Sequence, residues 1–137
     1  MMHEEWDGLS DDIFVRRVLW DEAPESRPMI LELEEEERRL FGDEEEASPG
    51  MYSLVSDAFV HPVLIPMLQA KDWDLGAALG AARAIESLLA SNRSAIGDLV
   101  SLRITDQLLW EPRFIEFVER YGGPRTKAEL RDRKSLA

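Results

Sequence analysis

The sequence contains no cysteine and only two histidines. Without cysteine the chain has no disulfide, no thiolate nucleophile and no sulfur ligand for zinc, which suits a reducing compartment. His3 and His61 fall short of the three or four protein ligands that a zinc site uses. We therefore expect no metal, and a cytoplasmic location.

Motifs for nucleotide chemistry and for nucleophilic catalysis are also lacking. Gly76 and Gly80 fall inside an alanine-rich helical pattern rather than in a phosphate-binding loop. No serine stands in the glycine-flanked spacing of a hydrolase nucleophile. The sequence predicts no cofactor and no catalytic residue.

Long apolar runs are missing as well. The longest, residues 58–68, contains His61 and two prolines and is far shorter than the roughly 20 residues that cross a bilayer. The first ten residues are acidic, whereas a secretory signal begins with basic residues before an apolar run. We expect neither a membrane-spanning segment nor an export signal.

What the chain does have is apolar residues at helical spacing along most of its length. The pattern predicts an all-α fold, with residues 1–137 forming a single domain of about six or seven helices. These helices would form an irregular bundle or a short array of stacked antiparallel helix pairs. Residues 1–9 and 128–137 are expected to fray, and the acidic segment 43–50 to form a mobile loop.

Capping residues and prolines set the expected helix boundaries. Ser10 is placed to cap the first helix, and Gly42 to end the second. Pro62 and Pro66 should divide residues 51–70 into two short helices or kink a single one. We expect a core formed by the apolar faces of the later helices, with Leu79, Ile85, Leu89, Leu99, Ile104, Leu108, Phe114 and Phe117 buried.

Acidic charge is concentrated in the first 50 residues. They hold 17 Asp and Glu against 5 Lys and Arg, whereas residues 51–137 hold 11 of each, so they account for the whole net charge of −12. Such a field repels phosphate backbones and attracts basic protein surfaces, so no nucleic-acid ligand is expected. The alternative is that the acidity only confers solubility. The candidate partner-binding residues are Glu34, Glu35, Glu36, Asp43, Glu44 and Glu45.

Glu86 and Asp106 are the two acids that lie inside strongly apolar helical patterns. The common use of such a residue is an ion pair, and Glu86 has Arg83, Arg93 and Arg103 as candidate partners. The alternative is a pocket between helices, formed by Glu86, Arg103 and Asp106, in a small enzyme or ligand-binding domain.

Residues 73–126 resemble a group of small bacterial helical proteins. The resemblance rests on Ile85, Glu86, Leu88 and Leu89, on Thr105, Asp106 and Leu108, and on Tyr121, Gly123, Pro124 and Thr126. Proteins of this kind include immunity proteins, the neutralising partners of bacterial polymorphic toxins. The resemblance implies an immunity-type or other protein-binding role rather than an activity. From the charge asymmetry we expect a non-catalytic protein whose acidic first half occludes a basic toxin domain. It names no toxin, and the oligomeric state stays open.

Overall fold

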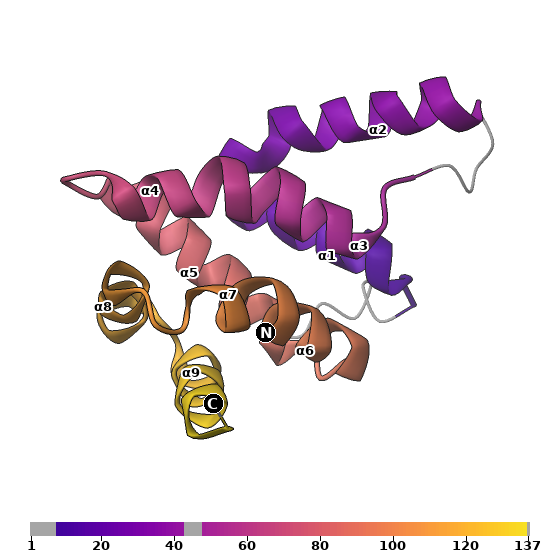
Figure 1. Ribbon diagram of the computed structural model, residues 1–137. Helices are drawn as coiled ribbons and strands as arrows, with labels where there is room; N and C mark the ends of the chain where they lie inside the picture. Colours follow the sequence, from indigo (N-terminus) through magenta and orange to yellow (C-terminus); the bar gives the residue numbers. More distant parts are fainter. Residues whose placement is uncertain (1–7, 43–47, 137) are drawn as a thin grey trace.

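The computed structural model describes residues 8–42 and 48–136, and these form helices joined by short connections (Figure 1). The predicted all-α class is confirmed, with seven continuous helices in the described part of the chain. The first three are α1 (Asp11–Glu22), α2 (Arg27–Phe41), which follows the short turn η2 (Pro24–Ser26), and a helix made of α3 (Met51–Ser53), η3 (Leu54–Leu64) and α4 (Ile65–Gln69). The others are α5 (Leu75–Ala90), a helix made of α6 (Ser94–Val100), η4 (Ser101–Thr105) and α7 (Asp106–Leu108), then α8 (Pro112–Tyr121) and α9 (Pro124–Leu136).

Local chemistry fixes several of the helix ends. The Ser10 side chain accepts a hydrogen bond from the Ile13 amide at 3.3 Å, and Asp74 caps α5 in the same way. Gly42 follows α2 with φ of 78°, a conformation that glycine adopts at little cost. Asn92, at φ of 57°, lies in the turn between α5 and α6.

Residues 51–69 form one uninterrupted helix rather than two short ones (Figure 1). From Leu54 to Leu64 its hydrogen bonds join residues five apart, as from the Ile65 amide to the Val60 carbonyl. Pro62 lies inside this wider section, where the helix continues despite the missing amide hydrogen.

The same helix is, within residues 8–42 and 48–136, the one long and apolar enough to cross a membrane by length and composition. Core helices pass the same test. Here Leu54, Phe59 and Leu64 are fully buried in the protein core, while Asp57 and His61 are exposed on the outer side. The inner side of this helix therefore contributes to the protein core.

Helix α5 occupies the centre, because it packs against α1, α6, α8 and α9. Six of the eight predicted core residues are buried, but Leu79 is 37% exposed and Leu89 is only half-buried. On α5 the prediction was right for Ile85 and wrong for Leu79 and Leu89. The rest of its buried face includes Ala78, Ala82 and Leu88. The small alanine side chains let α5 approach its neighbours closely. Their face of the helix is therefore buried, although alanine is less apolar than the leucines at positions 79 and 89.

The end of the chain also differs from expectation. Residues 128–136, which the sequence predicts to fray, continue α9 as far as Leu136. Leu130 is buried in the core, and Thr126 is buried within the first turn of α9. Packing against α5 and η4 explains why a strongly polar helix remains ordered.

Candidate functional site

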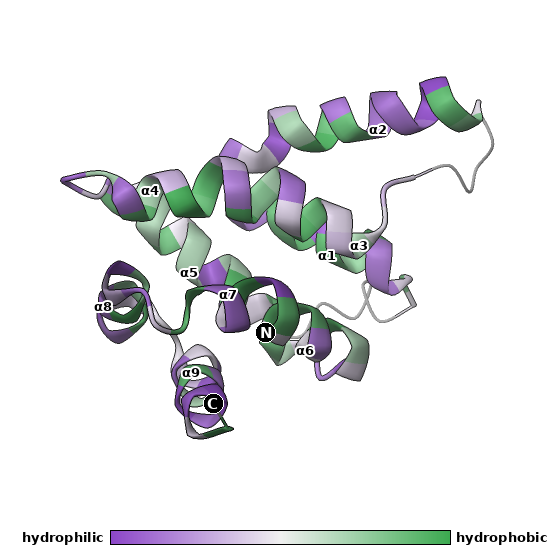
Figure 2. Cartoon of the chain, in the orientation of Figure 1, coloured by the Kyte–Doolittle hydropathy of each residue, from purple (hydrophilic) through white to green (hydrophobic). Residues whose placement is uncertain are grey.

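Helix α2 lies along one edge of the molecule, and its C-terminal end stands clear of the other helices (Figure 1). Ile30 is its one fully buried residue. Figure 2 shows polar and apolar residues alternating along this helix up to its free end. The helix therefore presents most of its surface to solvent.

The candidate residue Glu34 is not part of that free surface. Its carboxylate accepts two hydrogen bonds from Arg16 of α1, from Nε at 2.5 Å and from Nη2 at 3.1 Å. The Arg16 guanidinium also lies over the ring of Trp20, 4.9 Å from its centroid. Glu34 therefore holds α2 against α1 and is a structural residue rather than a binding residue.

Glu35 and Glu36 are both exposed, as is Glu32, which the sequence analysis did not select. Glu35 accepts a hydrogen bond of 2.8 Å from Arg38, and this bond, together with the charge of Arg38, lowers the pKa of Glu35. We call Glu32, Glu35 and Glu36 the acidic face of α2. The other candidates, Asp43, Glu44 and Glu45, lie outside the described residues.

Three exposed apolar residues on α2 were not predicted. Leu31 is 50% exposed, Leu40 66% and Phe41 61%. By helical spacing, Leu40 and Phe41 continue the apolar stripe of Ile30 and Leu33, which faces the other helices. No other described helix lies beside the last turn of α2, so the end of this stripe is exposed. Helical periodicity is the same for an apolar stripe that packs against another helix and for one that does not, so the exposure of these residues could not be predicted.

Glu86 does not pair with Arg83, Arg93 or Arg103 and instead caps the N-terminus of α9. Its carboxylate accepts hydrogen bonds from the Arg125 amide at 3.2 Å and from the Thr126 amide and hydroxyl, both at 2.9 Å. Burial opposes ionisation of Glu86, but the bonds from Thr126 and Arg125 and the charge of Arg125 together lower its pKa. A Cβ on Gly123 would lie 2.5 Å from this carboxylate, so glycine permits the approach. Glu86 thus has a structural role with a different partner from those predicted.

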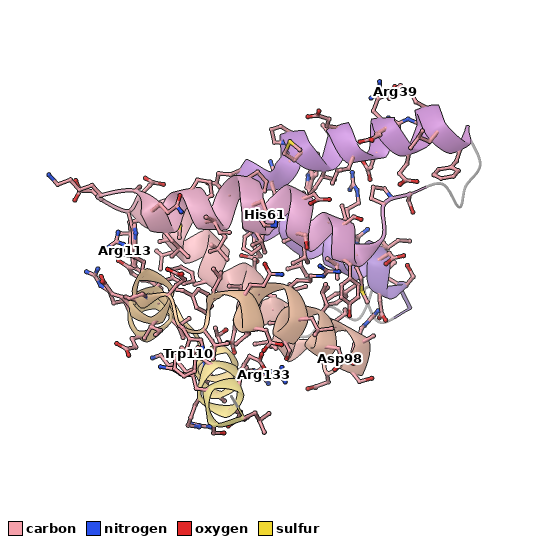
Figure 3. The ribbon with its side chains drawn as sticks, viewed as in Figure 1. Arg39, His61, Asp98, Trp110, Arg113 and Arg133 are labelled. Carbon is pink, nitrogen blue, oxygen red and sulfur yellow. The ribbon has the colours of Figure 1, made fainter. Side chains whose placement is uncertain are left out.

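The predicted pocket residues do not converge. Asp106 accepts two hydrogen bonds from Arg133 of α9, at 2.8 and 2.6 Å. Arg133 is labelled in Figure 3. The Arg103 guanidinium lies 5.2 Å from the ring centroid of Tyr52. Glu86 and Asp106 are therefore both bound to α9, at different positions, whereas Arg103 lies against Tyr52 of α3. Within the described ranges, no three His, Asp or Glu residues are grouped to hold a metal ion.

The tryptophans occupy different environments. Trp20 is half-buried between Arg16 and Arg27, and Trp73 packs against Phe117. Trp110 is 63% exposed at the connection between α7 and α8 (Figure 3). It is one of several exposed apolar residues outside α2, which also include Ile13, Leu75, Leu79, Leu102 and Leu136, and it lies on a different side of the molecule from the end of α2.

Comparisons with protein-family models, with curated proteins and with solved structures find no match to this chain. The geometry of the chain itself therefore carries the functional argument.

Proposed function

We propose that this protein is a non-catalytic binding domain that uses the acidic face of α2 to engage a basic protein. In its most specific form, the proposal is an immunity-type protein of a bacterial cell that occludes a basic toxin domain. The observation that carries the proposal is the exposed group of Glu32, Glu35 and Glu36, with the exposed Leu40 one turn beyond Glu36, on a helix that stands off the body. Acidic charge speeds the approach of a basic partner, and exposed apolar side chains then provide area to bury.

The alternative, a pocket using Glu86, Arg103 and Asp106, receives no support from the geometry. The carboxylate of Glu86 holds the start of α9, and that of Asp106 holds Arg133 near its end. A catalytic or ligand-binding carboxylate needs to face a site shared with other functional groups. Both acids are better explained as anchors for the last helix.

The test compares how well two variants with the same net charge capture a basic protein. Glu32→Lys/Glu36→Lys reverses two exposed acids on α2 and leaves the structural pair of Glu34 with Arg16 in place. Asp72→Lys/Glu119→Lys makes the same change in net charge at two exposed acids on other elements. Each immobilised protein is exposed to a lysate of the organism that encodes it.

The proposal predicts that the wild type and the Asp72/Glu119 variant capture the same basic protein, and that the α2 variant loses it. Circular dichroism should show equal helix content in all three. If the two variants capture this protein equally, or if none is captured by the wild type, the acidic face of α2 has no such function.

A further inference from the structure

Helix α9 carries an exposed basic stripe that neither the fold nor the proposed function uses. Lys127, Arg131 and Lys134 are spaced four and three residues apart, so they lie along one side of the helix. Lys127 and Arg131 are exposed, and the Lys134 ammonium lies 5.5 Å from the ring centroid of the exposed Trp110. Arg133 points to a different side, because it is bound to Asp106. We call Lys127, Arg131 and Lys134 the basic stripe of α9.

We infer that the basic stripe of α9 binds the acidic face of α2 on a second copy of this chain. The two helices lie on opposite sides of the molecule, so they do not meet within one chain (Figure 1). A contact between two different surfaces of identical chains is head-to-tail, and it produces a closed ring or an open series of molecules.

The order of the side chains along the two helices supports this pairing. Glu32, Glu36 and Leu40 follow one another every four residues, so Leu40 lies about 12 Å along α2 from Glu32. On α9, Lys134 and the adjoining Trp110 lie about 10 Å along the axis from Lys127. Two helices side by side in the same direction therefore place Glu32 near Lys127, Glu36 near Arg131, and Leu40 near Trp110.

Three charges weaken this complementarity. Arg38 is bound to Glu35 of the acidic face and offsets part of its charge. Arg39 is exposed near the end of α2, and Figure 3 shows it directed away from the body. Asp132 lies 3.5 Å from Arg131 and offsets part of its charge. Exposed ion pairs are individually weak. We therefore expect the self-association to form only at high protein concentration and to dissociate in high salt.

The experiment is sedimentation equilibrium of the purified chain at concentrations up to about 1 mM. At that concentration, even an interaction with a Kd of about 1 mM leaves much of the protein associated. At about 0.1 M salt the Debye length is about 10 Å, which screens the distant repulsion between two acidic molecules but not pairs in contact. We expect a weight-average mass rising above the 15.7 kDa of the monomer. At about 1 M salt, where the Debye length is about 3 Å, the mass should return to that of the monomer.

Charge reversal then identifies the surfaces. Glu36→Lys and Arg131→Glu should each weaken self-association about tenfold, because each replaces an attraction with a repulsion. An equal mixture of the two should regain the mass of the wild type, since Glu36 of one variant meets Arg131 of the other and the two introduced charges also complement each other. Lys71→Glu, which makes the same charge change as Arg131→Glu at an exposed lysine before α5, should have no effect beyond that of net charge.

A wild type that remains at 15.7 kDa throughout overturns the inference. So does a mixture that fails to regain association, or an equal effect of Lys71→Glu and Arg131→Glu. The foreign basic partner of the proposed function is absent from this experiment, so either proposal can fail while the other stands.

Discussion

At the scale of single residues, Glu86 shows how a charged side chain can serve an apolar helix. It projects from α5 to the first backbone amides of α9, which have no hydrogen-bond acceptor within their own helix. A carboxylate is favoured there both by hydrogen bonding and by the helix dipole. The sequence identifies Glu86 as unusual, but the residues it meets are about 40 positions away, and local spacing does not reveal them.

We predict that Glu86→Gln destabilises the protein by about 1 kcal/mol near neutral pH, the usual cost of losing a helix cap. Folding lowers the pKa of Glu86 below its ordinary value of 4.5, so the ionised form contributes stability above that value. This contribution is lost as the pH falls through the pKa of the folded protein. Urea unfolding should therefore show a difference between wild type and variant at about pH 7 that narrows at about pH 3.

Glu119→Gln is the matched control, because Glu119 is an exposed acid on α8. It should change the free energy of unfolding little at either pH. If Glu86→Gln instead costs the same at both pH values, the charge of Glu86 is not what holds α9.

At the scale of helices, Gly80 sets how closely α1 and α5 approach each other. A Cβ at this position would lie 2.5 Å from the carbonyl oxygen of Glu22, at the end of α1. Gly80 lies inside an alanine-rich helical pattern of the sequence, and helical glycines often mark such an approach. Which helix would come close is decided by tertiary packing.

Gly80→Ala should lower the midpoint of urea unfolding, because the clash involves backbone that must move. The clash should cost up to about 3 kcal/mol. This is more than the roughly 1 kcal/mol by which alanine stabilises a helix relative to glycine. Gly76→Ala is the control, since its Cβ would meet only the Asp74 side chain, at 3.6 Å. A Gly80→Ala protein as stable as the Gly76→Ala protein would contradict the close contact between α1 and α5.

Helix α2 combines a buried start with an exposed end, and this division is also testable. Ile30 is fully buried, so Ile30→Ala should reduce the free energy of unfolding by about 2–5 kcal/mol. Phe41 is 61% exposed, so Phe41→Ser should stay within about 0.5 kcal/mol of the wild type. Equal losses of stability in the two variants would mean that the end of α2 is packed in solution.

The helix boundaries follow largely from local chemistry, whereas burial and partners depend on packing. Ser10, Gly42 and Asp74 mark helix ends because capping acts within a few residues. The buried face of α5 was predicted wrongly at Leu79, because alanines rather than leucines face its neighbours. The order of the last helix was also missed, since its contacts come from α5 and η4.

At the scale of the whole molecule, the acidic face and the central contacts lie on different helices, although α1 and the start of α2 in the acidic half also contribute buried residues to the core. The acidic face lies on α2, at one edge, while the central contacts are made by α5. The sequence concentrates acidic charge in the first half, but it does not show which side chains there are exposed. Glu34 is bound to Arg16, whereas Glu32, Leu40 and Phe41 are exposed. A surface so placed can be altered without disturbing the core.

The most direct test of this account is the association rate constant with the captured basic protein, measured by stopped flow at two salt concentrations. The account predicts that the rate for the wild type falls by about tenfold or more between about 0.01 M and about 1 M salt, as the Debye length shrinks from about 30 to about 3 Å. Glu32→Lys/Glu36→Lys should associate more slowly at low salt and depend far less on salt. A rate that is indifferent to both salt and charge reversal would contradict the account and leave the acidity as a means of solubility.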